Sequence, residues 1–316
     1  QDGKILEELY STTPSRVDLR RIIYTYQEKY EALFLEVSSH GLSQGRMKGL
    51  FFFAAGWTSF SQDHLDYHGN MQEYFNAKSE INNHIIAGNP IIIASAEKEL
   101  IKRLKEKSLI KVAALCDRSK FQNANNVFNI AYNKSNLELS LEIVDSLWTI
   151  KENINLESLI PPPGRFSLLT NKNEKVIVDY AHTPDALENI CSAVRMEYKE
   201  YFLIIVFGCG GDRDPLKRSL MGKAAEIYSD LVIVTSDNPR LEDPNVIINE
   251  IIKGMNKEYV IEADRKKAIK MAMCHKSSRP KIVIIAGKGH EEYQDINGEK
   301  IAYSDFTVIN EIWDIE

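Results

Sequence analysis

From about residue 175 onward, short apolar runs alternate with segments of helical periodicity, and each run ends in a glycine-rich or polar turn. The apolar runs are continuous rather than alternating, which is typical of parallel strands buried on both faces. Helices fit into the intervals between the runs, so the pattern predicts a βαβ succession. We expect five strands in this half, VIVDY (176–180), FLIIVFG (202–208), LVIVTSD (231–237), YVIEA (259–263) and KIVIIAG (281–287).

The first half is less regular, but its apolar runs also predict an α/β fold. We expect a helix over 16–29, strands over 32–37 and 50–57, and a helix over 70–85. Three consecutive prolines stand between the halves in LIPPPGRFS (159–167), and they favour a stiff, extended connection. A chain of 316 residues is long enough for two cores, so we expect one domain over 1–160 and another over 161–316.

Charge and composition narrow the classes of partner. The net charge of −6 argues against broad attraction to nucleic acid or to an anionic membrane, and no apolar stretch is long enough to span a bilayer. The four cysteines show no CxxC spacing, which argues against a disulfide framework and a zinc site. We therefore expect a cytoplasmic protein that acts on small molecules, without nucleic-acid or membrane partners and as a monomer.

The turns that follow the predicted strands carry the most informative polar residues. Ligands of open parallel sheets bind beyond the carboxyl ends of the strands. Asp179 and the turns GCGGDRD (208–214), SDNPR (236–240) and AGKGHEE (286–292) should therefore converge on one crevice. Asp179 is suited to accept ribose hydroxyls, and the glycines of the first turn let backbone N–H groups approach an anion closely.

The first half carries two polar segments with more than one interpretation. Glu36 stands beside hydroxyls in LEVSSHGLSQGRMKG (35–49), and this group is either a magnesium site or a satisfied polar turn. WTSFSQDHLDYHGN (57–70) contains two histidines and two aspartates, which either bind a metal or cap the next helix. In that helix, Lys78 falls on or beside the apolar face. It either extends to water or, as a partly buried neutral amine, reacts with carbon dioxide to give a carbamate.

The segments EVSSHGL, DHLDYHG and NAKSE together resemble the central domain of the Mur ligase family. The resemblance implies a magnesium (Mg²⁺) site made of Glu36, His64 and Lys78, the last as a carbamate. It also implies that the UDP-muramoyl substrate is held by Thr12, Thr13, Ser38, Gln44 and Arg46. FQNANN (121–126) is similar to the segment of the family that meets adenine, which indicates Asn125.

The second half resembles the same family over VDYAHTPDAL, FGCGGDRD, SDNPRLEDP, AGKGHEEYQ and YSD, in family order and spacing. A Rossmann-like C-terminal domain is implied, with Arg165 and Asp179 at ATP. In this family DNPR marks selection of meso-diaminopimelate, and the residues implied are Arg213, Asp237, Asn238, Arg240, Gly287 and Glu291. The planar guanidinium of Arg240 is suited to pair a carboxylate with two hydrogen bonds. Alternatively, Arg240 pairs with Glu242 or Asp243.

The implied activity is an amide-bond ligase that adds meso-diaminopimelate to UDP-N-acetylmuramoyl-L-Ala-D-Glu for peptidoglycan synthesis. ATP would activate the acceptor carboxylate as an acyl phosphate, with Mg²⁺ at the phosphates. No GxxxxGK[ST] phosphate-binding loop occurs in this sequence. In the family this loop and a uridine-binding domain precede the region where this chain begins, so we expect an incomplete central domain.

Three other interpretations remain open at this point. One is a non-catalytic relic that binds diaminopimelate or a muramoyl peptide without turnover. Another is a nicotinamide-dependent oxidoreductase, suggested by the glycines of GCGGDRD, although GxGxxG is not matched. Folylpolyglutamate synthetase shares the superfamily, but DNPR and AGKGHEE favour the muramoyl branch.

Overall fold

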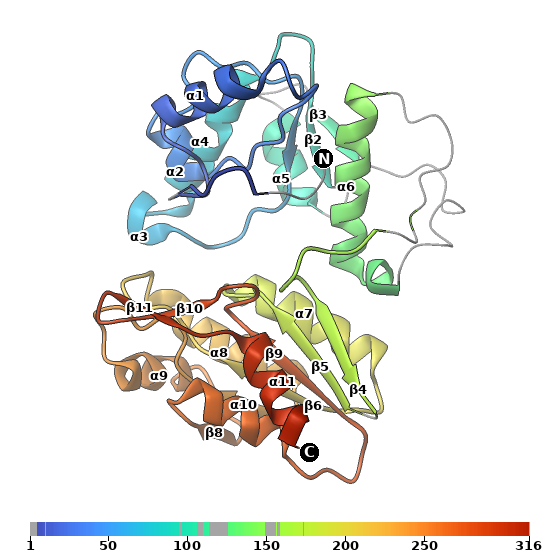
Figure 1. The fold of residues 1–316 in the computed structure, drawn as a ribbon, viewed down its shortest axis with the longest axis vertical. Coiled ribbons are helices and arrows are strands. Elements are labelled where there is room, and N and C mark those ends of the chain that lie inside the picture. The colour runs from blue at the N-terminus through green and yellow to red at the C-terminus, as the bar shows by residue number, and fades with distance from the viewer. Residues whose placement is uncertain are drawn as a thin grey trace. The chain divides into compact units, whose positions relative to one another are not determined.

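A computed structural model describes residues 5–9, 11–94, 97–105, 110–113, 126–148, 156, 159–172 and 174–315 (Figure 1). Contacts divide the chain into two compact units. Unit 1 comprises Gln1–Phe60, Tyr67–Ser119 and Ser135–Ile154, and unit 2 comprises Ser61–Asp66, Lys120–Lys134 and Asn155–Glu316. The domain limits 1–160 and 161–316 stay a prediction. No helix among the described residues is long and apolar enough to cross a membrane.

A six-stranded sheet forms the centre of unit 2, with the strand order β4-β5-β9-β6-β7-β8. All neighbouring strands are parallel except β4 and β5, which are antiparallel. The five strands expected from the sequence are confirmed, and β4 is an addition. The bounds are β4 (Ser167–Asn171), β5 (Glu174–Asp179), β6 (Phe202–Phe207), β7 (Leu231–Val234), β8 (Tyr259–Ile261) and β9 (Lys281–Ala286).

Helices cover both faces of this sheet (Figure 1). One face packs against α7 (Pro184–Glu197), α8 (Leu216–Tyr228) and α9 (Pro244–Ile252), and the other packs against α10 (Arg265–Met273) and α11 (Asp305–Ile315). Successive strand residues alternate between the two cores, as Ile284 and Ile285 do. This two-sided burial explains why the strands are continuously apolar in sequence.

Two further strands, β10 (Tyr293–Ile296) and β11 (Glu299–Ala302), form a hairpin. Its turn is Asn297-Gly298, with φ of +54° and +81°. Asn-Gly is the most favoured pair for such a two-residue turn, so the sequence carried a signal for this hairpin that strand periodicity alone did not give.

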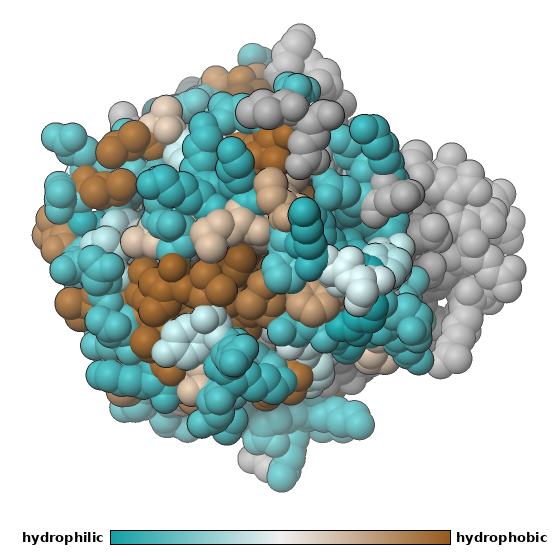
Figure 2. Space-filling view, turned by 90° about the horizontal axis from the view of Figure 1, so that it is seen from below, coloured by the Kyte–Doolittle hydropathy of each residue, from teal (hydrophilic) through white to brown (hydrophobic). Residues whose placement is uncertain are grey.

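One of the two edge strands of the large sheet is β8, where Tyr259 and Ile261 are 37% and 46% exposed. Figure 2 shows apolar side chains gathered on one face of the molecule. The exposed apolar side chains of unit 2 include Met196, Tyr259, Ile261, Met271 and Ile301.

A smaller parallel sheet, in the order β1-β2-β3, forms the centre of unit 1. Its strands are β1 (Ala55–Trp57), β2 (Ile91–Ala94) and β3 (Ile110–Ala113). The described residues of the first half contain the helices α1 (Arg16–Tyr26), α2 (Ser39–Ser43), α3 (Leu65–His68), α4 (Met71–Ser79), α5 (Lys98–Lys105) and α6 (Ala131–Leu147), with 3₁₀ turns at Glu80–His84 and Asn126–Asn129.

The strand predicted over 32–37 is wrong, because this segment has no regular secondary structure and Leu33 and Phe34 are 51% and 55% exposed. An apolar run reports which side chains favour burial, but a strand also needs neighbours that supply backbone partners. The strand predicted over 50–57 shrinks to β1. The helix predicted over 70–85 becomes α4 followed by a 3₁₀ turn, and the helix predicted over 16–29 ends at Tyr26.

Candidate functional site

In unit 2, the turns after β6, β7 and β9 meet at the carboxyl ends of their strands, as expected. The Gly211 N–H donates to the Asn238 carbonyl at 2.9 Å, and Arg240 Nη1 donates to the Gly211 carbonyl at 2.6 Å. The Gly287 N–H donates to the Asp179 carbonyl at 3.1 Å. The topology of a parallel sheet thus brings residues more than a hundred positions apart into one crevice.

Glycine is required at the first turn because neighbouring backbone lies against it. A Cβ on Gly208 would lie 2.3 Å from the Thr235 carbonyl oxygen, and one on Gly211 would lie 1.9 Å from the Pro239 carbonyl oxygen. From the sequence, these glycines were expected to let an anion approach the backbone. In the structure, their lack of a side chain lets the turn that follows β7 pack against them.

Asn238 and Glu291, both predicted to contact the amino acid, are hydrogen-bonded to each other. Asn238 Nδ2 donates to Glu291 Oε2 at 2.9 Å. Lys288 donates to both of these residues, at 2.9 Å to Asn238 Oδ1 and 3.0 Å to Glu291 Oε2. Sequence reasoning missed Lys288, because most lysines extend to water and nothing in GKG marks this one as buried.

Arg240 lies on the same crevice in a strained conformation, with φ of +52°. Its N–H donates to the Asp295 carbonyl at 2.9 Å, and its carbonyl accepts from the Asn297 N–H at 2.7 Å. Glu242 is paired with Arg218 at 2.8 Å, and the charge of Arg240 also helps to lower the pKa of Glu242. The alternative of a structural pairing of Arg240 with Glu242 or Asp243 stays a prediction.

Two more of the predicted amino-acid ligands have different surroundings. Arg213 is exposed and donates only weakly to the Asp212 carbonyl, at 3.4 Å, so it lies at the rim. Asp237 is buried, and among the described residues its Oδ1 has no hydrogen-bond partner. Burial raises the pKa of Asp237, although the nearby Arg265 and Lys288 oppose that rise.

A buried ion pair lies beneath this crevice. Arg265 Nε and Nη2 both donate to the Asp305 carboxylate at 2.8 Å, and both side chains are fully buried. Arg265 Nη2 also donates to the Ala286 carbonyl at 2.9 Å, the last residue of β9. The YSD segment (303–305) thereby fixes the end of the strand from which the GKG turn begins.

Asp179, predicted to contact ATP, uses its carboxylate within the protein. Its Oδ2 accepts from the Phe166 N–H at 2.7 Å and its Oδ1 from the Ala181 N–H at 2.8 Å. Burial raises the pKa of Asp179. Arg165 is exposed, with its guanidinium carbon 4.6 Å from the Tyr180 ring centroid. The ATP roles of both residues stay predictions, and Asn125 lies outside the described residues.

In unit 1, the residues predicted to hold the UDP-muramoyl substrate form one hydrogen-bonded group. Thr13 Oγ1 donates to the Glu36 carbonyl at 3.0 Å and accepts from the Ser38 N–H at 2.8 Å. Arg46 donates to the Thr13 carbonyl and, at 2.7 Å, to Gln44 Oε1. Thr12, next to Thr13, is exposed.

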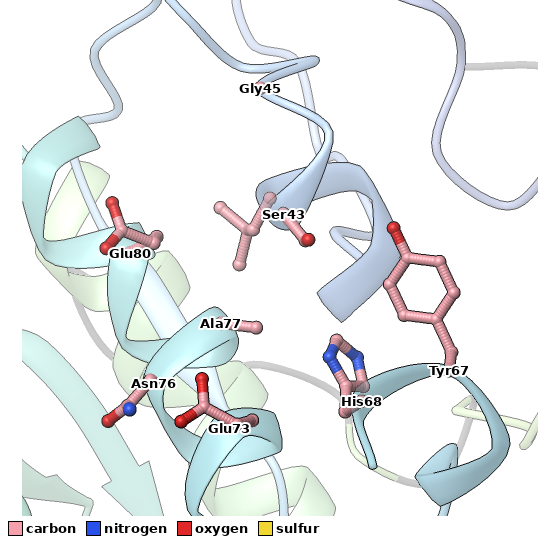
Figure 3. Close-up of a pocket in the computed structure, with 9 residues that line it drawn as sticks. Ser43, Gly45, Tyr67, His68, Glu73, Asn76, Ala77 and Glu80 are labelled. Carbon is pink, nitrogen blue, oxygen red and sulfur yellow. The ribbon is translucent and has the colours of Figure 1, made fainter.

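Beside this group lies a cavity of about 580 Å³ (Figure 3). Tyr67 and His68 stand on one side of the cavity, and Glu73, Asn76 and Glu80 stand on the other. Gln44 Nε2 donates to the Tyr67 hydroxyl at 3.4 Å, which connects the cavity to the predicted substrate group. Sequence reasoning did not identify the acidic lining residues: Glu73 lies on α4, and Glu80 begins the 3₁₀ turn that follows it.

The three predicted magnesium ligands are not collected in one unit. Glu36 is exposed in unit 1, and Lys78 Nζ lies 5.4 Å and 5.8 Å from the ring centroids of Tyr74 and Trp57. His64 belongs to unit 2 and has φ of +56°. In the part of the chain that is described, no three His, Cys, Asp or Glu side chains form a metal-binding group. A carboxylate and a carbamate offer oxygen ligands that suit Mg²⁺, but the structure does not show the site assembled.

Asp63, next to His64, has its own partners within unit 2. Its carboxylate lies 3.5 Å from Lys217 Nζ, 3.6 Å from His64 Nε2 and 3.8 Å from His182 Nε2. Burial alone would raise the pKa of Asp63, but Lys217 and the two histidines hold it below its usual value.

Comparison with known proteins matches two family models. Residues 3–171 match the Mur ligase middle domain, and residues 164–289 match the Mur ligase glutamate ligase domain. The UDP-N-acetylmuramoyl-L-alanyl-D-glutamate–2,6-diaminopimelate ligase of Lawsonia intracellularis is 37% identical over 95% of this chain and 69% of the relative. The enzyme of the same name from Aquifex aeolicus is 39% identical over 95% of this chain and 67% of the relative.

Solved structures agree. A diaminopimelate ligase of the same name gives a TM-score of 0.53 at 29% identity, covering 99% of this chain and 71% of the other. A MurF ligase from Thermotoga maritima, solved with ADP, gives 0.60 at 16% identity over 86% of this chain and 65% of the other. The second likeness concerns the fold alone.

Proposed function

Since this chain belongs to the Mur ligase family, we propose that it is an ATP-dependent ligase adding meso-diaminopimelate to UDP-N-acetylmuramoyl-L-Ala-D-Glu in peptidoglycan synthesis. Its curated relatives are named as ligases over nearly all of this chain, which argues against both the oxidoreductase and the relic. Both ATP and UDP-linked precursors are cytoplasmic metabolites, so the proposal implies a cytoplasmic protein.

The observation that carries the proposal is the arrangement of Asn238, Arg240 and Glu291 around one crevice. Asn238 Nδ2 keeps a second N–H, and Arg240 keeps guanidinium N–H groups beyond the one that meets Gly211. Glu291 contributes a carboxylate oxygen that accepts. Donors beside an acceptor match the distal end of diaminopimelate, where a carboxylate and an ammonium share one carbon.

Chemically, the acceptor carboxylate of the muramoyl dipeptide attacks the γ-phosphorus of ATP, and ADP leaves. The amine of diaminopimelate then attacks the acyl carbon, loses a proton, and inorganic phosphate departs. In this proposal Thr12, Thr13, Ser38, Gln44 and Arg46 orient the muramoyl substrate, and Arg213, Asp237 and Gly287 complete the amino-acid pocket. Arg165, Asp179 and Asn125 serve the nucleotide. The protein's main contribution is to position charged groups before they react.

Mg²⁺ is proposed as the metal of this reaction, with Glu36, His64 and Lys78 as its holders. When bound, it would offset negative charge on the phosphoryl group being transferred. Lys78 is half-buried, with its Nζ 5.8 Å and 5.4 Å from the ring centroids of Trp57 and Tyr74, and a carbamate would form from its neutral amine. The intact mass of the protein in bicarbonate, compared with that of Lys78→Ala, tests this modification separately from activity.

The first experiment is calorimetric titration of the chain with meso-diaminopimelate and with lysine. We expect diaminopimelate to bind and lysine to bind far more weakly, because lysine has no distal carboxylate for Arg240. Arg240→Ala should abolish the difference. Arg279→Ala is a matched control, since Arg279 pairs with Asp230 outside the crevice, and it should bind like the unchanged protein.

Equal binding of the two amino acids, or no binding of either, would contradict the proposal. A second assay follows ATP-dependent amide formation with all three substrates, and this assay separates a ligase from a protein that only binds.

A further inference from the structure

Lys288 is a fully buried lysine of unit 2. It stands between Gly287 and Gly289 in the turn after β9, and its side chain has no solvent exposure. A lysine rarely gives up water unless other groups take up all of its donors. Here the ammonium lies 2.9 Å from Asn238 Oδ1, 3.0 Å from Glu291 Oε2 and 3.7 Å from Asp237 Oδ1.

These contacts fix the orientation of the Asn238 amide. Its Oδ1 accepts both from Lys288 and, at 3.0 Å, from the Asp295 N–H. Two donors on one atom identify that atom as the oxygen, so Nδ2 must be the atom that faces Glu291. The amide can therefore only donate to a ligand in the crevice.

Lys288 also makes the two carboxylate oxygens of Glu291 different, because it binds only one of them. Oε2 accepts from both Lys288 and Asn238 Nδ2. Among the described residues, the contact of Oε1 is a long one with the Tyr180 hydroxyl, at 3.4 Å. Oε1 is therefore the atom left for a cationic group of the ligand.

Formal charges in the buried cluster lead to the same conclusion. Asp237, Glu291 and Asp305 are acidic, whereas Lys288 and Arg265 are basic. With all five ionised, one negative charge is left over. In the proposed pocket Arg240 pairs with the ligand carboxylate, so the ligand ammonium is the group that would balance this charge. Removing Lys288 would leave two uncompensated negative charges beside the ligand, a costly arrangement away from water.

We propose that Lys288 is a positioning residue of the amino-acid pocket: it orients Asn238 as a donor and Glu291 as an acceptor, and so selects a ligand whose distal end is zwitterionic. The inference rests on the proposed function. Lys288 does not reach the ligand in this account, because its side chain has no solvent exposure and two of its three N–H groups are taken by Asn238 and Glu291. Its longer separation from Asp237 argues against a role as the simple counter-ion of that residue.

The test compares two ligands. Diaminopimelate carries both distal groups, whereas 2-aminopimelate keeps the distal carboxylate and lacks the distal amine. If Lys288 acts through Glu291, Lys288→Met should reduce the preference for diaminopimelate over 2-aminopimelate by on the order of tenfold. General damage to the pocket would weaken both ligands alike and leave their ratio unchanged.

The matched control is Lys281→Met. Lys281 begins β9, the strand that Lys288 follows, and pairs with Glu174 at 3.2 Å. The control should keep the ratio of the unchanged protein. Lys288→Gln is a second variant that keeps a neutral donor in case the methionine variant does not fold, and its ratio should fall between the other two. Thermal unfolding of each variant reports folding separately.

An unchanged ratio in a folded Lys288 variant, or an equal fall in Lys281→Met, would overturn the inference while leaving the proposed function intact. If the unchanged protein binds no diaminopimelate, the proposed amino-acid site fails and the role of Lys288 fails with it. The two failures are therefore distinguishable in one series of titrations.

Discussion

At the scale of single residues, Arg240 combines a binding role with backbone strain. A non-glycine residue at φ of +52° persists only where surrounding bonds hold it, and here Asp295 and Asn297 bond to its backbone on both sides. The predicted chemistry needs the guanidinium, so glycine, which would relieve the strain, cannot serve at this position. The strain is therefore the consequence of placing an arginine where the turn favours glycine.

Two substitutions of Arg240 should therefore have the same effect on binding but different effects on stability. Arg240→Ala and Arg240→Gly should lose diaminopimelate binding equally, because both remove the guanidinium. The glycine variant should be more stable than the alanine variant by about 1 kcal/mol, since only alanine keeps the strained φ. Urea unfolding of both variants measures the difference, and equal stabilities would show that the loop relaxes at this position.

Individual residues also show which parts of the candidate site could be predicted from the sequence. Asn238, Arg240 and Glu291 were identified from the motifs around them, and the structure brings them to one crevice. Lys288 was not identified, because burial of a lysine depends on partners that are distant in sequence. Asn238 lies 50 positions from Lys288 and 57 positions from Asp295, the two residues that donate to its Oδ1. No local pattern reports which amide atom faces the ligand.

At the scale of elements, the turn after β6 packs directly against the turn after β7. Gly211 leaves no room for a side chain, because its Cβ would lie 1.9 Å from the Pro239 carbonyl oxygen. Arg218 of α8 joins the same elements, donating to Glu242, to Glu250 of α9 and, at 3.3 Å, to the Gly210 carbonyl. The pocket is therefore held by contacts between turns and helices rather than by any single loop.

Gly211→Ala should destabilise unit 2 and weaken diaminopimelate binding together. The expected loss in free energy of unfolding is roughly 1–3 kcal/mol, because backbone and not a flexible side chain must move. Gly298→Ala is the control, since a Cβ there meets nothing within 4 Å and only the positive φ is affected. Chemical denaturation and calorimetric titration of both variants test the prediction. Full binding by Gly211→Ala would contradict it.

The Arg218–Glu242 contact predicts a pH dependence of stability. The Arg218 guanidinium holds the pKa of Glu242 below its usual value. The folded state therefore binds fewer protons at this site than the unfolded state, for which the glutamate pKa is about 4.3. The stabilisation is present above that value and is lost as pH falls through the lower, folded pKa.

The measurement is the free energy of unfolding of the unchanged protein and of Glu242→Gln, at about pH 6 and about pH 3. The advantage of the unchanged protein should shrink as pH falls. Other carboxylates titrate in both proteins, so the comparison isolates this one. A constant advantage across the range would mean that Glu242 titrates alike in both states.

The elements themselves were partly predictable. Five parallel strands were readable because burial on both faces makes them continuously apolar. Strand β4 was not, because its residues are only partly buried and its pairing with β5 is antiparallel. The apolar run over 32–37 failed as a strand for the converse reason, since apolar side chains do not by themselves supply a backbone partner.

At the scale of the whole molecule, the two units differ in the size of their cores. The sheet of unit 2 is covered by large buried clusters on both faces. The described residues of unit 1 contain three smaller clusters, which include Phe75, Met47 and Ile92 respectively. Local stability follows the extent of buried apolar contact, so the units should not unfold together.

Scanning calorimetry should therefore show two transitions, with unit 1 unfolding at the lower temperature. Diaminopimelate should raise the upper transition and leave the lower one nearly unchanged, because its predicted ligands all lie in unit 2. A single transition, or a shift of the lower one alone, would contradict this assignment. A shift of the upper transition would also show that unit 2 binds the amino acid after unit 1 has unfolded.

The short outer strand β8 affects how this chain behaves at high concentration. An open sheet edge is a template onto which another chain can add its own strand, and apolar edges invite aggregation. Here the edge is only three residues long, and Glu258 and Glu262 border it with negative charge. Two copies approaching edge to edge would bring these acids together before many backbone bonds had formed. We therefore expect this edge of the sheet to discourage fibrous self-assembly, even though Tyr259 and Ile261 are exposed to water.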